Sequence, residues 1–288
     1  MSLNDKFNQM TTRIEVRAPG GRSSTGSGFF YSSLAPSEGT GPRWRKIEEM
    51  LVVTNRHVLL PRFNSKEFAP QNVSLYLRGI NKSTNQLKWI EVSLDSRQLE
   101  EKARFHPNDD VDVALIDIQS ELSALVEQET LTSPHLFNAQ SQAGNNNISV
   151  EVGSDVLVAG YPRGFYDDVN LFPIVKAGII ASRWGAPFQG NPYFLIDAKL
   201  FPGSSGSVVV SKPIDIVIKE GQIMYSEEKQ FALLGIFSGE PFLREEPVQI
   251  GDLTITKESG FDLGIVWYAY TIEEARINGV SVSGALRR

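Results

Sequence analysis

The sequence of 288 residues contains no cysteine. The fold therefore needs no disulfide bond, and a cysteine nucleophile and a thiolate metal site are both excluded. Histidine is scarce as well, because the chain has only His57, His106 and His135, each far from the others. Such isolation argues against a zinc cluster. We predict neither a metal nor a cofactor, and we interpret His106 and His135 as structural or surface residues.

Other common features are also missing. No apolar run reaches the roughly 18 residues that a membrane-spanning helix needs, so we expect no membrane span. The 28 basic residues are outnumbered by 34 acidic ones, and no basic patch is present, which argues against nucleic acid as a partner. The N-terminus lacks a signal-peptide pattern. Because Met1 to Leu3 resembles a cloning remnant, the compartment stays open: cytoplasmic as written, secreted or periplasmic if a leader has been removed.

The sequence does have enough apolar residues, 41%, for a large core, and most of it reads as short strands. These segments are rich in Val, Ile, Phe and Tyr and are separated by Gly, Pro, Asn and Ser. The candidates are 13–17, 50–54, 73–77, 88–94, 111–118, 155–160, 174–182, 193–200, 206–211, 231–238 and 264–270, with a hairpin over 214–225. Many short strands at this spacing indicate antiparallel barrels or a sandwich.

Helices are few. Thr271 and Glu274 have the spacing of a capping box, which predicts a helix that ends at Gly279. A weaker helical pattern covers 121–128, and the segments 33–49 and 240–260 read as loops. The polar stretch 133–147 is the best linker, and it divides the chain into β-rich halves at 12–132 and 148–288.

Two residues of the first half suit proton transfer. His57 directly follows a buried-looking strand, and its near-neutral pKa suits a general base. Asp112 begins an apolar strand, where a carboxylate needs a partner such as an imidazolium. Each also has a structural interpretation. His57 could simply bond a backbone carbonyl, and Asp112 could be a solvated turn residue, with Asp109, Asp110 and Asp117 as competitors.

The second half offers a nucleophile in Phe201-Pro-Gly-Ser-Ser-Gly-Ser-Val-Val-Val210. Glycines on both sides of the Ser204–Ser205 pair allow a strained turn that exposes a side-chain oxygen. Two N–H groups of such a turn can point the same way, as an oxyanion requires. A flexible Gly-Ser linker fits poorly, because the run is short and lies between apolar segments. A tight turn between strands is the structural alternative.

The order His57, Asp112, Ser205 is that of chymotrypsin-type enzymes, whereas α/β-hydrolases place the serine first and require glycine where Ser207 stands. At this point the sequence resembles the chymotrypsin-fold (trypsin-like) serine proteases, nearest the bacterial HtrA/Deg and V8-like branch. The matching motifs are Thr25-Gly-Ser-Gly-Phe29, Thr54-Asn-Arg-His-Val58, Asp112-Val-Ala-Leu-Ile116, Val158-Ala-Gly-Tyr-Pro162, Gly178-Ile-Ile-Ala-Ser182, the serine motif 197–207, Leu234-Gly-Ile-Phe-Ser-Gly239 and Gly264-Ile-Val-Trp-Tyr268.

The resemblance implies an all-β fold of two antiparallel six-stranded β-barrels with a short C-terminal α-helix. His57 and Asp112 would lie in the barrel 12–132, and Ser205 with the substrate pocket in the barrel 148–288, the two forming one peptidase domain. Asp112 would hold the His57 tautomer, and His57 would take the proton of Ser205. The backbone N–H groups of Gly203 and Ser205 would form the oxyanion hole.

By the same resemblance, the substrate-binding residues are Lys199, Leu200, Phe201, Phe237, Ser238 and Gly239. Relatives have a small residue where Lys199 stands, so Lys199 could favour an acidic substrate side chain. The alternative, which we favour, is that its stem lines the wall while the ammonium reaches water or pairs with Glu240.

The departures from the family pattern matter too. Ser204 stands where digestive relatives have an aspartate, so activation by a new N-terminus is not expected. HtrA enzymes usually carry a PDZ domain after the protease domain, whereas we expect none after the last predicted helix of this sequence. The resemblance therefore implies a serine endopeptidase that cleaves proteins or peptides through an acyl-enzyme. A latent or inactive trypsin-fold binding module and an esterase are the alternatives, and the oligomeric state stays open.

Overall fold

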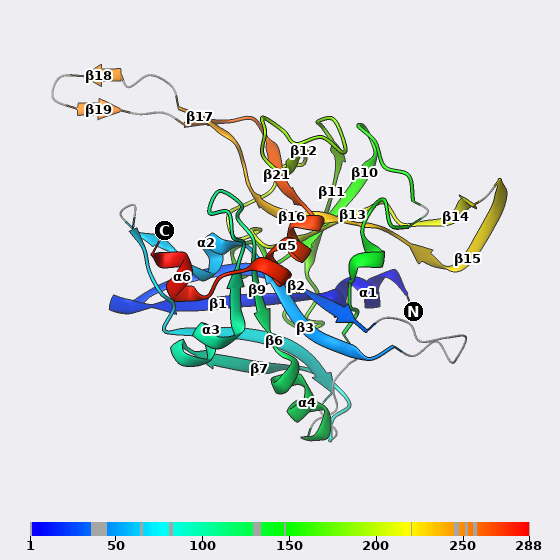
Figure 1. The fold of residues 1–288 in the computed structure, drawn as a ribbon, viewed down its shortest axis with the longest axis horizontal. Helices are drawn as coiled ribbons and strands as arrows, with labels where there is room; N and C mark the ends of the chain where they lie inside the picture. The colour runs from blue at the N-terminus through cyan, green and yellow to red at the C-terminus, as the bar shows by residue number, and fades with distance from the viewer. Residues whose placement is uncertain are drawn as a thin grey trace.

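The computed structural model describes residues 2–35, 45–63, 66–80, 83–128, 134–146, 148–219, 221–244, 248–250, 253–255 and 258–287. Antiparallel strands dominate it. The first half forms a seven-stranded sheet and the second half a closed six-stranded barrel. In Figure 1 the sheet occupies the lower part of the view in blue and cyan, and the barrel the upper part in green to orange.

The sheet of the first half has the strand order β7-β6-β1-β2-β3-β9-β8. Its strands are β1 (Thr11–Ala18), β2 (Arg22–Leu34), β3 (Ile47–Thr54), β6 (Asn72–Ile80), β7 (Leu87–Asp95), β8 (Ala103–Phe105) and β9 (Ala114–Asp117). We predicted six strands in a closed barrel. The sequence patterns had located five strands in this half, and β2 and β8 were not among them. β2 begins with a run rich in Ser and Gly, and β8 is only three residues long, too short for a periodic signal. Among the described residues no pairing joins β7 to β8, so closure is not confirmed.

The predicted barrel of the second half is confirmed, with the closed order β10-β11-β12-β21-β16-β13. Its strands are β10 (Asp155–Gly160), β11 (Ile174–Ile180), β12 (Tyr193–Asp197), β13 (Val208–Ser211), β16 (Leu233–Gly239) and β21 (Leu263–Tyr268). The other strands form two-stranded pairs: β4 (Arg62–Phe63) with β5 (Lys66–Glu67), β14 (Ile214–Lys219) with β15 (Gln222–Gln230), β17 (Phe242–Arg244) with β20 (Glu258–Gly260), and β18 (Val248–Ile250) with β19 (Leu253–Ile255). The predicted hairpin is β14–β15, which projects from the barrel in Figure 1.

The two halves pack through strands that are buried on both faces. In β3, Val52 points into the core of the sheet, whereas Leu51 and Val53 point into a second cluster shared with the barrel. The barrel strand β13 does the same, since Val208 belongs to the shared cluster and Val209 to the barrel interior. Burial on both sides explains why these strands read as continuous apolar runs. It also fixes the sheet against the barrel.

The helices are α1 (Leu3–Met10), α2 (Arg56–Leu59), α3 (Ser96–Lys102), α4 (Gln119–Gln128), α5 (Tyr270–Asn278) and α6 (Val282–Leu286), with 3-10 turns at Pro19–Gly21, Ala139–Ser141 and Pro162–Gly164. None of the described helices is long and apolar enough to cross a membrane. The weakly predicted helix corresponds to α4. Ser2 caps helix α1, because its hydroxyl accepts a hydrogen bond from the Asp5 N–H at 3.1 Å.

The predicted capping box at Thr271 is wrong. Helix α5 begins earlier because Ala269, directly after β21, already has helical φ and ψ of −59° and −25°. Thr271 therefore lies in the first turn, where its hydroxyl donates to the Tyr268 carbonyl at 2.7 Å. Glu274 instead contacts His106 at 3.0 Å. The helix does end before Gly279, as predicted.

The described part of the proposed linker is packed against both halves. Phe137 is only 1% exposed and forms a bridge with Tyr31 of β2, and Gln142 forms one with Leu233 of β16. The C-terminal helix α6 packs on the first sheet, since Val282 and Ala285 belong to its core. The division at 12–132 and 148–288 stays a prediction. Of the predicted loop 33–49, residues 36–44 lie outside the described residues, and its ends belong to β2 and β3. The predicted loop 240–260 is wrong in its described part, which contains the short strands β17 to β20.

Candidate active site

His57 and Asp112 form a close pair at the end of β3. His57 sits in the short helix α2, directly after β3, and Asp112 precedes β9, which pairs with β3. The His57 Nδ1 and Asp112 Oδ2 atoms are 2.6 Å apart, and the His57 backbone N–H donates to Oδ1 at 2.9 Å. Since an ionised carboxylate only accepts hydrogen bonds, Nδ1 carries the proton. The other ring nitrogen, Nε2, is thereby left as an acceptor.

The Asp112 carboxylate also affects the pKa of the His57 imidazole. Burial acts to lower the pKa of His57, but the charge and the hydrogen bond of Asp112 outweigh it, so the pKa lies above its ordinary value of 6.5. The nearby Arg62 guanidinium opposes this shift. The His57 side chain is 44% exposed, whereas that of Asp112 is 20% exposed, so part of the imidazole is open to solvent.

The competing aspartates have other partners. Asp109 forms an ion pair with the buried Arg56 at 3.0 Å, and Asp117 caps the start of α4 by accepting from the Gln119 N–H at 2.9 Å. Asp110 donates its own N–H to the Asn108 side chain at 3.0 Å. Asp112 itself is placed by the Asn55 amide, which donates to its carbonyl at 2.7 Å. Of these carboxylates, only Asp112 contacts His57 in the part of the chain that the structure describes.

Ser205 lies in a turn between two left-handed glycines, Gly203 with a φ of +87° and Gly206 with a φ of +83°. Gly206 has no room for a side chain, because a Cβ there would lie 1.9 Å from the Ser27 carbonyl oxygen. Its N–H donates to the Phe237 carbonyl at 2.8 Å. By contrast, the N–H groups of Gly203 and Ser205 donate to no described residue. Two backbone N–H groups without an acceptor, next to a serine hydroxyl, can donate hydrogen bonds to a developing oxyanion.

Ser27 of β2 holds this turn, a role that we did not predict. Its N–H donates to the Ser205 carbonyl at 2.8 Å. Its hydroxyl donates to the Gly203 carbonyl at 3.3 Å and accepts from the Tyr161 N–H at 2.8 Å. Ser27 is the serine of the motif Thr25-Gly-Ser-Gly-Phe29, which was the available signal. The first sheet therefore fixes the serine turn of the second half.

Ser238 joins the Ser205 side of the site to the His57 side. Its hydroxyl donates to Asp112 Oδ2, and its carbonyl accepts from the Ser205 hydroxyl at 2.8 Å. The structure thus brings His57, Asp112 and Ser205 around one residue. The Ser205 hydroxyl has no described hydrogen bond to His57 in this arrangement. We had assigned Ser238 only to substrate binding.

A cavity of about 400 Å³ opens beside Ser205. It is lined by Lys199, Leu200, Phe201, Pro202, Ser205, Phe237, Gly239, Glu240 and Asp262, so it includes every predicted pocket residue except Ser238. The Lys199 ammonium lies 3.5 Å from Asp262, not Glu240, and both side chains are more than two-thirds exposed. A second hollow of about 410 Å³ adjoins His57 and Asp112. The candidate site therefore has one cavity next to Ser205 and a second next to His57 and Asp112.

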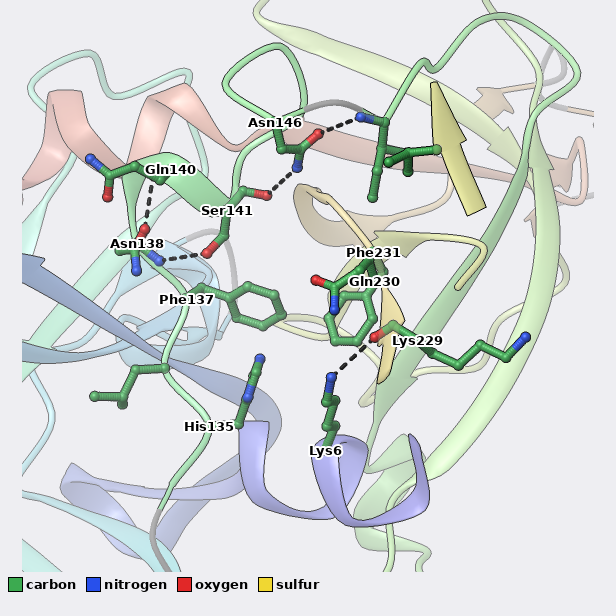
Figure 2. Close-up of a pocket in the computed structure, with 13 residues that line it drawn as sticks. Lys6, His135, Phe137, Asn138, Gln140, Ser141, Asn146, Lys229, Gln230 and Phe231 are labelled. Atoms are coloured by element: carbon green, nitrogen blue, oxygen red, sulfur yellow. Dashed lines mark hydrogen bonds between the residues drawn. The ribbon is translucent and has the colours of Figure 1, made fainter. Parts of the chain in front are cut away.

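Another cavity, of about 380 Å³, lies away from this site between α1, residues 135–148 and the end of β15 (Figure 2). His135 lines it, with its ring centroid 5.6 Å from that of Phe137 and 6.0 Å from that of Phe231. Burial and the Lys6 ammonium lower the pKa of His135 from 6.5 to about 4, so the ring is neutral. Neither His135 nor His106 contacts the candidate site. Within the described ranges, no group of three His, Asp or Glu residues is arranged to hold a metal.

Several solved structures are similar to the chain. The Rv3671c protease from M. tuberculosis, in its active form, shares 18% identity over 97% of this chain and 87% of its own, with a TM-score of 0.45. Deg5 shares 16% identity over 80% and 85% of the two chains, with a TM-score of 0.41. A scabies mite inactivated protease paralogue shares 13% over 95% and 97%, with a TM-score of 0.44.

No curated protein matches the chain. A family model does. The model of the trypsin-like peptidase domain matches residues 26–217, which is more than half of the chain and contains the motifs of His57, Asp112 and Ser205. This match confirms the resemblance to trypsin-like proteases that the motifs predicted. The chain belongs to the family of trypsin-like peptidase domains.

Proposed function

We propose that the protein is a serine endopeptidase that uses Ser205 as nucleophile, His57 as general base and Asp112 as the partner of His57. The observation that carries this proposal is the set of bonds around Ser238. One residue contacts both the Asp112 carboxylate, which holds His57, and the hydroxyl of Ser205. Such an arrangement needs no metal or cofactor, because the nucleophile, base and oxyanion donors all come from the chain.

In the proposed reaction the Ser205 hydroxyl leaves the Ser238 carbonyl and donates to His57 Nε2. As Ser205 Oγ attacks the peptide carbonyl carbon, its proton passes to Nε2, and the carbonyl oxygen becomes an oxyanion at the N–H groups of Gly203 and Ser205. His57 then protonates the departing amine, which leaves Ser205 acylated. A water molecule, deprotonated by His57, then attacks the ester carbonyl, and His57 returns the proton to Ser205 Oγ as the acid product leaves.

Loosened hydrogen bonds between nucleophile and base are common without substrate, and they tighten in the substrate complex. A protein or peptide is the proposed substrate, since the cavity beside Ser205 and the hollow beside His57 can receive side chains on both sides of the scissile bond.

The pH profile of kcat/KM tests the base. His57 acts only when neutral, and its pKa is raised above 6.5. Activity is therefore expected to fall as the pH drops through that raised pKa, so the midpoint of the acid limb should lie above pH 6.5. A midpoint well below 6.5 in the parent protein would contradict the assignment of His57 beside a charged Asp112.

Peptides that differ only in the residue before the scissile bond test both the reaction class and Lys199. We expect peptide cleavage, fastest with apolar residues at that position, because Leu200, Phe201 and Phe237 line the cavity. Aspartate and glutamate should give no gain. The exposed Lys199–Asp262 pair contributes about 0–1 kcal/mol, and an acidic side chain would also meet the carboxylates of Asp262 and Glu240.

A clear preference for aspartate or glutamate would instead support Lys199 as a specificity residue, and Lys199→Met should then abolish it. Turnover of simple esters without cleavage of any peptide would support the esterase alternative. Tight peptide binding without turnover would support a binding module.

A further inference from the structure

The oxyanion donor Gly203 shares a peptide group with Pro202. In a trans peptide the carbonyl of one residue and the N–H of the next point in opposite directions. The Pro202 carbonyl accepts from the Arg163 N–H at 3.0 Å. This bond therefore also fixes the direction of the Gly203 N–H. The contact is close, because a Cβ on Gly203 would lie 2.3 Å from the Arg163 nitrogen.

Arg163 belongs to residues 161–172, within the loop that connects β10 to β11 and contains only a short 3-10 turn. Arg163 and Leu171 both have positive φ, at 51° and 59°, and such conformations cost non-glycine residues about 1–3 kcal/mol each. They persist only where surrounding contacts impose them. Asp167 and Phe172 close the loop with backbone bonds of 3.1 and 3.2 Å. The Tyr161 N–H donates to the Ser27 hydroxyl at 2.8 Å, but neither contact holds the Leu171 end or joins it to Tyr161.

The buried side chain of Arg78 binds both ends. Arg78 lies on β6 of the first sheet and is 5% exposed. Its Nε and Nη2 atoms donate to the Leu171 carbonyl at 2.9 and 2.8 Å, and Nη2 also donates to the Tyr161 hydroxyl. Nη1 donates to the Thr11 carbonyl at 2.8 Å, and the guanidinium lies 4.7 Å from the Trp89 ring centroid.

We propose that Arg78 is a positioning residue for the oxyanion hole, acting through residues 161–172 on the Pro202–Gly203 peptide. A buried guanidinium is costly unless its donors are satisfied, so its removal leaves carbonyls without donors and frees both ends of the strained segment. The Arg163 N–H then no longer holds the Pro202 carbonyl. The Pro202–Gly203 peptide is then held only from its far side, where the Ser27 hydroxyl donates to the Gly203 carbonyl at 3.3 Å, and the Gly203 N–H can turn away from the oxyanion site. This inference rests on the proposed function.

The test compares two ligands with the same peptide sequence. A peptidyl trifluoromethyl ketone adds Ser205 Oγ and places a negative oxygen at the oxyanion donors, whereas the matching primary amide binds without that oxygen. In Arg78→Met we expect the affinity for the ketone to fall about 100-fold, the loss typical of one oxyanion donor. The affinity for the amide should change little. For peptide hydrolysis, kcat should fall in parallel while KM is retained.

The matched control is Arg13→Met. Arg13 lies in the same aromatic cluster, 3.8 Å from the Tyr76 ring centroid and 5.2 Å from that of Tyr166. It therefore touches the segment 161–172 through a ring, but it donates no described hydrogen bond to it. It should keep the ketone affinity. Arg78→Lys should recover part of that affinity, because it keeps the charge but not the planar fork. A purely structural role for Arg78 would lower the melting temperature without changing the ratio of the two affinities.

Thermal unfolding shows whether Arg78→Met is folded. If its unfolding is not cooperative, the comparison is made with Tyr161→Phe, which removes one hydroxyl partner of Arg78 but keeps the ring in the core. Equal ketone-to-amide ratios in the parent and in the folded variants would overturn the role of Arg78. A parent protein that binds the ketone no better than the amide, as Ser205→Ala should, would instead show that the proposed function itself has failed, and the inference with it.

Discussion

Replacing Ser205 with alanine is expected to reduce kcat for peptide hydrolysis by about 10⁶-fold, the loss found when a serine nucleophile is removed from a triad. The physical reason is that, of the two serines between the left-handed glycines Gly203 and Gly206, only Ser205 donates its hydroxyl to the Ser238 carbonyl in the described structure. Cleavage of a peptide that the parent protein accepts, followed by chromatography, measures the effect. KM should change little, because the Ser205 hydroxyl reacts with the bound substrate but is not expected to contribute to its binding.

The neighbouring serine provides the control. Ser204 is 3% exposed, and its turn bonds are made by its backbone, with its N–H donating to Phe201 and its carbonyl accepting from Ser207. Ser204→Ala should therefore retain most of the activity. If Ser205→Ala hydrolysed the peptide at a rate close to that of the parent, or if both serine variants lost activity equally, Ser205 would not be the nucleophile.

The second large effect is expected for Asp112→Asn, which should lower kcat about 10⁴-fold. An asparagine amide can donate to His57 Nδ1, and this would move the ring proton to Nε2, where it blocks acceptance of the Ser205 proton. The negative charge that raises the pKa of His57 is lost as well, while burial still lowers it. The acid limb of any remaining activity should therefore move to lower pH.

Asp117→Asn is the matched control, because Asp117 lines neither cavity of the site and accepts from the Gln119 N–H at 2.9 Å, a bond that an asparagine oxygen can still accept. Its kcat and pH profile should match those of the parent. The assignment of Asp112 would be contradicted if Asp112→Asn kept nearly full activity with an unchanged acid limb.

The candidate site could be predicted from sequence to the extent that each residue lies in its own short motif. His57, Asp112 and Ser205 were assigned in this way, and the structure places them around Ser238. The bonds of Ser27 to the serine turn could not be predicted, because they join β2 to a turn nearly two hundred residues later. The same holds for the Lys199 ion pair, which depends on how Asp262 is placed by β21.

The fold shows a similar limit. Alternating and continuous apolar runs were sufficient to predict most strands, whereas the six-stranded barrel of the second half was implied by the resemblance to trypsin-like proteases. The short strand β8 gave no periodic signal, and the Thr271 capping pattern was overridden because β21 leads directly into α5. Local patterns therefore identify elements and motifs, whereas contacts between distant segments determine which polar groups support the site.

Intact-mass measurement after treatment with a fluorophosphonate tests the central proposal most directly, because the probe phosphonylates a serine only when its hydroxyl is activated. The proposal predicts one adduct on the parent protein, located on the peptide that contains Ser205, and none on Ser205→Ala. A folded parent protein that forms no adduct, or an adduct that persists in Ser205→Ala, would contradict the proposal that Ser205 is an activated nucleophile.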